Sequence, residues 1–142
     1  MRAVIETSSP EETRQFALRI AGQVSSGTVI ALSGELGAGK TVFAKGFCHA
    51  LGFGGNVSSP SFTLVNIYQV GTLTINHVDC YRLNDPSEVE DLGPDELFYP
   101  AGITLVEWAE KIKSYLPATT VWIKIELLTA ESRRIEIVDP RT

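Results

Sequence analysis

The residues with the clearest chemical purpose form one glycine-rich run, Gly34-Glu35-Leu36-Gly37-Ala38-Gly39-Lys40-Thr41. Its spacing fits G-x-x-x-x-G-K-[ST], in which backbone N–H groups surround phosphates, the lysine reaches the β- and γ-phosphates, and the hydroxyl coordinates Mg²⁺. The neighbours supply the required context, because a buried strand is predicted before the run and a helix after it. We therefore predict a nucleotide phosphate site formed by Glu35, Leu36, Gly37, Ala38, Gly39, Lys40, Thr41 and Val42.

Two carboxylates follow strand-like runs and are candidates to bind the magnesium ion, directly or through water. Glu107 follows the apolar run 103–106, which would place it at the carboxyl end of a buried strand, beside the ligand crevice of an α/β sheet. Asp79 also ends a strand-like run, but its predicted hairpin suggests a more peripheral position, where it would polarise water or organise a switch. We favour Glu107 as the acid on the metal side, directly or through water. The alternative is that either carboxylate only solvates a strand end. The predicted catalytic residues are Lys40, Asp79 and Glu107, and the predicted metal-site residues are Thr41 and Glu107.

The absence of certain motifs reduces the number of nucleotides and activities that this phosphate site could serve. No Asn-Lys-x-Asp motif, which reads guanine, follows the loop, so ATP is the expected nucleotide. The long arginine-rich lid with which many small-molecule kinases protect a transferred phosphoryl group from water is also missing. An ATPase is favoured. A small-molecule kinase and a nucleotide-dependent binding module without meaningful turnover remain open alternatives.

The elements that must position these residues alternate between strands and helices. A serine cap and Pro10 begin a helix that is expected to end near Val24, and a second helix begins within the glycine motif. Predicted strands cover 3–5, 28–32, 64–70, 73–78, 103–106, 121–128 and 134–138, with hairpins at 71–72 and 129–132. A short helix is expected from Asp85, and residues up to Tyr115 can be helical. The pattern predicts an α/β fold: a single-domain P-loop NTPase with a mixed, largely parallel central sheet flanked by helices and antiparallel hairpin strands.

Composition limits the partners and the compartment. The 142 residues suffice for one domain, and 44% hydrophobic content can fill one core. A net charge of -5 disfavours direct, tight binding of nucleic acid. Cys48 and Cys80 lack disulfide or zinc spacing and are expected to be buried free thiols in a reducing compartment. No export signal is evident, and the apolar runs are far shorter than the roughly 20 residues of a membrane span. We expect a cytoplasmic protein with no membrane association.

Four motifs occur in an order that is hard to obtain by chance. They are Gly34 to Thr41, then Ser59-Pro60-Ser61-Phe62-Thr63-Leu64-Val65, then His77-Val78-Asp79-Cys80-Tyr81-Arg82, and finally Val106-Glu107-Trp108-Ala109-Glu110. With them the chain resembles, over nearly its whole length, the TsaE family of bacterial ATPases, formerly called YjeE, from the tRNA threonylcarbamoyladenosine pathway.

This resemblance implies a set of residue roles and partners. ATP and Mg²⁺ would be bound, Thr41 and Glu107 would attend the magnesium ion, and Asp79 and Trp108 would be functionally sensitive. A switch-like loop over 59–63 would include Ser59, Ser61 and Thr63. The protein partners would be TsaB and TsaD, with the threonylcarbamoyl transfer belonging to TsaD, so contact with tRNA would be only indirect.

Several single residues carry alternatives of their own. Arg82 either reaches a phosphate or a partner carboxylate, or forms an ordinary surface salt bridge. Trp108 either packs beneath the nucleotide site, or gates it or contacts a partner. His77 is expected to be a hydrogen-bonded packing residue and is left off the catalytic list. Thr13 is a candidate contact for the adenine base.

Overall fold

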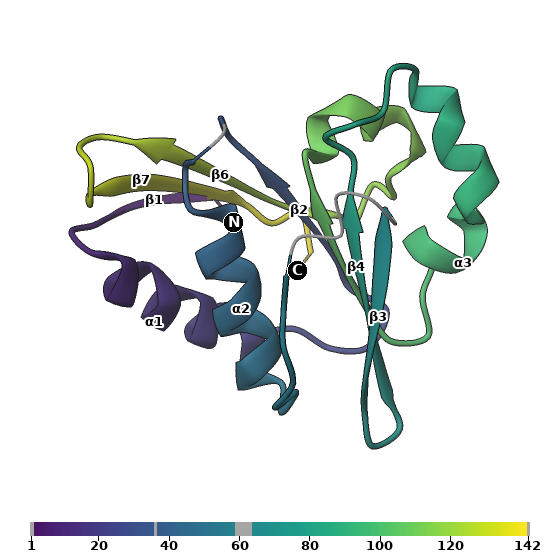
Figure 1. The fold of residues 1–142 in the computed structure, drawn as a ribbon, viewed down its shortest axis with the longest axis horizontal. Coiled ribbons are helices and arrows are strands. Elements are labelled where there is room, and N and C mark those ends of the chain that lie inside the picture. The colour runs from purple at the N-terminus through teal and green to yellow at the C-terminus, as the bar shows by residue number, and fades with distance from the viewer. Residues whose placement is uncertain (1, 36, 59–63, 142) are drawn as a thin grey trace.

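A mixed sheet of seven strands in the order β1-β7-β6-β2-β5-β4-β3 runs through the computed structural model, which describes residues 2–35, 37–58 and 64–141 (Figure 1). The strands are β1 (Arg2–Thr7), β2 (Val29–Ser33), β3 (Val65–Val70), β4 (Leu73–Asp79), β5 (Ile103–Glu107), β6 (Val121–Leu127) and β7 (Arg133–Val138). The α-helices are α1 (Pro10–Ala21), α2 (Lys40–Ala50) and α3 (Pro94–Phe98), and two 3-10 helices are η1 (Pro86–Leu92) and η2 (Ala109–Tyr115).

The centre of the sheet is parallel and its flanks are antiparallel. Strands β6, β2, β5 and β4 pair in parallel, whereas β7 and β1 on one side and β3 on the other run antiparallel to their neighbours. The predicted mixed sheet is confirmed. Because the carboxyl ends of parallel strands meet at one edge, the residues that follow β2, β4 and β5 converge there.

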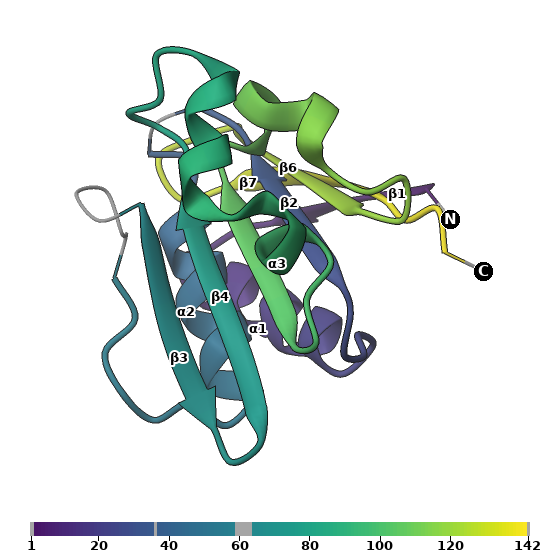
Figure 2. The ribbon, with the colours of Figure 1, turned by 90° about the vertical axis from the view of Figure 1, so that its right-hand side faces the viewer.

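Helices cover both faces of the sheet, with α1 and α2 on one face and α3 and the two 3-10 helices on the other (Figure 2). Alternate residues of β2 enter the two cores, since successive side chains of a strand point to opposite faces. Ile30 and Leu32 join the core with Phe43 and Phe47 of α2, and Val29 and Ala31 join the other core. The glycine loop therefore follows directly after a strand that is buried on both faces.

The helix boundaries largely follow the local signals. Ser9 caps α1 by accepting a hydrogen bond from the Glu12 N–H, and Pro10 occupies its first turn. The helix ends at Ala21, before the expected Val24, because Gly22 follows it. Helix α3 was not predicted. Among the described residues, no helix is long and apolar enough to cross a membrane.

The predicted hairpins are both present, but one of them leads to a wrong expectation. Strand β4 pairs antiparallel with β3 and also parallel with β5, so β3, not β4, forms the edge of the sheet. Asp79 is therefore not peripheral: it pairs in register with Glu107. A hairpin signal specifies the partner on one side of a strand and carries no information about the partner on the other side.

Candidate nucleotide site

A hollow of about 450 Å³ opens at the carboxyl edge of the parallel strands. Its walls come from the glycine loop, the first turn of α2, the ends of β4 and β5, and the start of β7. The lining residues are Gly37, Gly39, Lys40, Thr41, Val42, Asp79, Tyr81, Arg82, Glu107, Trp108 and Arg133. All of these except Tyr81 and Arg133 were predicted as site residues from the sequence.

The loop joins the end of β2 to the first turn of α2. Gly39 is the N-cap of α2 with φ of 107°, and no side chain caps this end of the helix. Backbone N–H groups at an uncapped helix N-terminus favour an anion. Thr41, exposed in the first turn, lines the hollow beside them. The arrangement suits a phosphate bound at the start of α2.

Lys40 is buried within this loop, with 5% of its surface exposed. Its Nζ donates hydrogen bonds to the carbonyl oxygens of Gly34 and Glu35, the latter at 2.9 Å, and lies 4.1 Å from the centre of the Trp108 ring. Burial lowers the pKa of Lys40, while nearby carboxylates, Glu110 first, act in the opposite direction. An ammonium group has three donors, so one remains for a phosphate oxygen after both carbonyls are satisfied.

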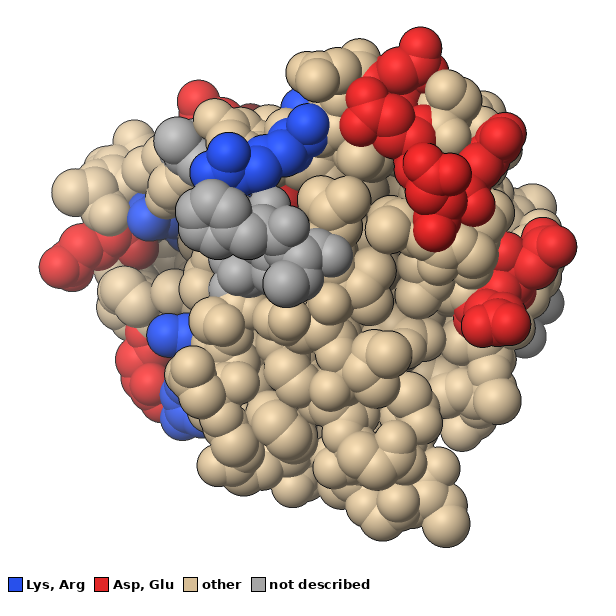
Figure 3. All heavy atoms as spheres, turned by 45° about the vertical axis from the view of Figure 1, so that its right-hand side comes forward, with Lys and Arg blue, Asp and Glu red and all other residues tan. Residues whose placement is uncertain are grey.

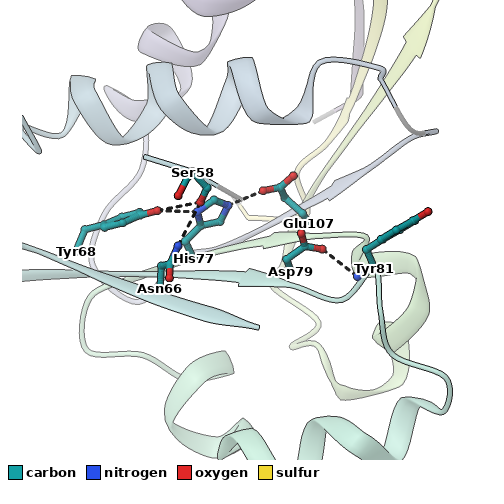
Figure 4. A network of polar contacts seen from close by, with 7 residues as sticks. All are labelled: Ser58, Asn66, Tyr68, His77, Asp79, Tyr81 and Glu107. Carbon is teal, nitrogen blue, oxygen red and sulfur yellow. Dashed lines mark hydrogen bonds and ion pairs between the residues drawn. The ribbon is translucent and has the colours of Figure 1, made fainter. Parts of the chain in front are cut away.

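Asp79 and Glu107 lie side by side at the ends of β4 and β5, and each is only 3% exposed. Asp79 Oδ1 accepts a hydrogen bond from the Tyr81 N–H at 2.9 Å, and Glu107 Oε2 lies 2.6 Å from Nε2 of His77 (Figure 4). Two buried carboxylates facing one hollow create a strongly acidic edge opposite Lys40. A cation between them and a phosphate would relieve this charge.

The donor set fits magnesium better than a transition metal. In the described part of the chain, no cluster of three or more His, Cys, Asp or Glu side chains could hold a metal ion alone. Mg²⁺ commonly takes one or two protein oxygen ligands and completes its shell with phosphate oxygens and water. Thr41 and the two carboxylates offer oxygen ligands of this kind on the wall of the same hollow.

Trp108 lines the hollow and, partly buried, packs against the core on the face of the sheet that carries α3 and the 3-10 helices. It is a non-glycine residue with positive φ, 57°, and it turns the chain from β5 into η2. Its ring lies against Lys40 and, with centroids 4.9 Å apart, against Tyr81. The partial burial of Trp108 against the core agrees with the expectation that it packs there. A gating or partner role remains a prediction.

The remaining predicted residues lie in different places. Arg82 is exposed at the rim of the hollow. Thr13 is buried in α1, its hydroxyl is hydrogen-bonded to that of Thr7 at 2.8 Å, and it borders a much smaller hollow that shares Gly39 and Val42 with the main one. Leu36, Ser59, Ser61 and Thr63 lie outside the described residues.

Sequence reasoning missed Arg133, which braces the loop from the C-terminal hairpin. Its Nε donates to the Ala38 carbonyl oxygen at 2.7 Å, and Nη2 lies 3.4 Å from the Gly37 carbonyl oxygen. No local motif marks this arginine. The parallel pairing of β6 with β2 brings the start of β7 to the loop, and no pattern in the sequence indicates that pairing.

The comparisons with known proteins agree on one family. The family model described as "Threonylcarbamoyl adenosine biosynthesis protein TsaE" matches residues 7–135, a range that contains the whole candidate site. The chain belongs to the TsaE family. A TsaE from Bacillus subtilis (strain 168), named a tRNA threonylcarbamoyladenosine biosynthesis protein, is 44% identical over 129 residues, which are 91% of this chain and 80% of that protein.

Further TsaE comparisons extend over nearly the whole chain. A TsaE of the same description from Treponema pallidum (strain Nichols) is 36% identical over 137 residues, 96% of this chain and 99% of that protein. The crystal structure of YdiB from Bacillus subtilis superposes with a TM-score of 0.84 at 37% identity, covering 98% of this chain and 86% of that one. The fold of this TsaE family member is thus shared with a solved structure.

Proposed function

We propose that the chain is an ATPase that binds and slowly hydrolyses Mg-ATP to support the TsaB–TsaD complex in forming N6-threonylcarbamoyladenosine in tRNA. One observation carries this proposal: the glycine loop with Lys40 and Thr41 faces two buried carboxylates, Asp79 and Glu107, across one hollow. The family description supports the pathway, and the names of the relatives point to the same modification.

The chain's own groups can divide the work of hydrolysis. A water molecule would attack the γ-phosphorus, the bond to the β–γ bridging oxygen would break, and ADP would leave. Lys40 offsets negative charge that develops on the phosphate oxygens. Asp79 or Glu107, acceptors when ionised, would orient the attacking water by accepting its hydrogen bonds. Thr41 and Glu107 would hold Mg²⁺ directly or through water, and the ion would supply charge neutralisation at the phosphates when bound.

Slow intrinsic turnover follows from the openness of this arrangement. Trp108, Tyr81 and Arg82 sit at one side of a hollow that reaches solvent, and Tyr81 is 42% exposed. Water exclusion and in-line geometry strengthen electrostatic stabilisation of a phosphoryl-transfer transition state. A protein partner that covers the hollow would supply both. We therefore propose that TsaB and TsaD raise the turnover.

The surface charge favours protein partners over direct contact with tRNA. The segment from Asp85 to Glu96 holds six acidic residues and no basic one. Figure 3 shows large acidic groups on the right, further acidic side chains along the left edge beside small groups of lysine and arginine, and a broad face below with neither. A phosphate backbone binds to concentrated positive charge. Access to tRNA through partners is consistent with this distribution.

The test is release of phosphate from ATP, measured with the chain alone, with TsaB and TsaD, and with a panel of small-molecule acceptors. We expect slow release that depends on Mg²⁺ and rises when both partners are present. A phosphorylated acceptor would identify a kinase instead. Nucleotide binding without release under any condition would identify a binding module.

A further inference from the structure

A buried chain of polar contacts leads from strand β3 to the candidate catalytic carboxylate. The Tyr68 hydroxyl lies 3.0 Å from Nδ1 of His77, and Nε2 of His77 lies 2.6 Å from Oε2 of Glu107 (Figure 4). The exposed fractions of the three residues are 6%, 1% and 3%. Both ring nitrogens of His77 therefore contact side chains inside the protein.

The contacts favour one placement of the imidazole hydrogen. A neutral imidazole has one donor and one acceptor nitrogen. The Tyr68 hydroxyl has one proton; the distance to Nδ1 of His77 is 3.0 Å, against 3.4 Å to the Ser58 carbonyl oxygen. Burial raises the pKa of Tyr68, so the phenol keeps that proton. With Nδ1 accepting from Tyr68, Nε2 carries the hydrogen and donates it to Glu107.

The surrounding structure holds this chain of contacts in one arrangement. His77 lies on β4, which is paired on both sides, opposite Asn66 of β3 and Leu105 of β5. The Phe53 ring stacks on Tyr68 with centroids 4.6 Å apart. A hydrogen-bond donor on a rigid strand fixes its acceptor more strictly than a solvated one would.

The hydrogen bond constrains one oxygen of Glu107 and leaves the other for the hollow. Figure 4 shows His77 at one carboxylate oxygen, while the second points away from the imidazole. Glu107 also lines the hollow that faces Lys40 and Thr41. Partners of this kind orient the groups that act directly on a metal or substrate, and removing them commonly costs about 10- to 100-fold in activity or metal affinity.

We propose that His77, held by Tyr68, is a positioning residue that fixes the Glu107 carboxylate for hydrolysis of ATP. This role rests on the ATPase activity proposed above. A packing role would require only a side chain of similar volume at position 77. The positioning role also requires, for full turnover, a hydrogen-bond donor at the place of Nε2.

The experiment compares three variants by phosphate release and by nucleotide affinity. His77→Leu replaces the imidazole with an apolar side chain that has no hydrogen-bond donor. We expect kcat to fall at least about tenfold while the affinity for ADP changes little. His77→Gln places an amide donor near Glu107 and is expected to recover much of the loss. The matched control is Asn76→Leu, the neighbour on β4, which removes the buried hydrogen bond to Thr104 on β5 and should leave kcat unchanged.

A second readout tests the geometry without nucleotide. The chain has two histidines, and His49 is exposed, so ¹⁵N-histidine NMR resolves His77 readily. We expect the tautomer with hydrogen on Nε2, and Tyr68→Phe should move the signals of His77 but not those of His49. Hydrogen on Nδ1 alone would overturn the proposed hydrogen bond to Glu107.

The kinetic outcomes separate the two proposals. If the wild-type protein turns over ATP and folded His77→Leu does so equally well, the positioning role is wrong and the ATPase stands. Equal losses in His77→Leu and Asn76→Leu would also overturn it, because they would indicate general destabilisation. If the wild-type protein releases no phosphate even with TsaB and TsaD, the ATPase proposal fails and the positioning role falls with it.

Discussion

Gly34, the first glycine of the loop, lies against the backbone of β6. A Cβ atom added there would stand 2.2 Å from the Ile125 carbonyl oxygen, and its φ is 135°. The Ile125 backbone has little room to move, because β6 pairs with β2 on one side and β7 on the other. For Gly34→Ala, the positive φ costs about 1–2 kcal/mol, and the forced overlap adds about 1–3 kcal/mol. We predict that the free energy of unfolding of the nucleotide-free protein falls by about 2–5 kcal/mol.

Gly37, three residues later, supplies the matched control. It has φ of 81°, but nothing lies within 4 Å of an added Cβ atom. Gly37→Ala should therefore cost only the conformational term, about 1–2 kcal/mol. Urea unfolding of both variants without nucleotide, followed by circular dichroism, gives the two values. If Gly34→Ala were no less stable than Gly37→Ala, the close approach of the loop to β6 would not constrain the fold as argued.

Three further variants or conditions probe the site and the core. Lys40→Met should abolish nucleotide binding by calorimetry. Because burial lowers the pKa of Lys40, the wild-type protein should gain stability relative to Lys40→Met as the pH rises toward 10.5, and a stability difference that does not change with pH would contradict this. Burial raises the pKa of Cys48 and of Cys80 to about 12, so alkylation of these thiols at pH 8 should be slow until denaturant is added. The contribution of the two buried thiols to stability should decline from about pH 9 upward. Rapid labelling of the native protein would refute this prediction. Arg133→Ala, which removes the brace on Ala38, should weaken ADP binding about tenfold with little change in unfolding, and unchanged affinity would exclude that role.

The sequence was informative where a property depends on neighbouring residues. The glycine motif, the cap at Ser9 and the hairpin turn at Gly71 depend on local backbone geometry, and the structure has each of them where it was predicted. Cys48 and Cys80 are buried free thiols, as their apolar surroundings indicated. The placement of Glu107 at the hollow followed from one buried run and the general rule for parallel sheets.

Strand order was not available from local patterns, and the errors at Asp79 and Arg133 follow from it. Asp79 joined the site because β4 lies beside β5, and Arg133 because β6 lies beside β2. The same pairing of β4 with β5 brought His77 to Glu107, although the two are 30 positions apart. Contacts of this kind depend on which strands are neighbours, and the periodicity within a strand carries no information about its neighbours.

The claim that the glycine loop and the paired carboxylates form one ATPase site is tested most directly by Glu107→Gln. This change keeps the size of a side chain that is 3% exposed and removes its charge. Phosphate release and ADP affinity should be measured together over a magnesium titration, in the presence of TsaB and TsaD. We predict that turnover falls about 100-fold or more while the variant still binds ADP through the loop. Wild-type turnover with unchanged dependence on magnesium would contradict the account.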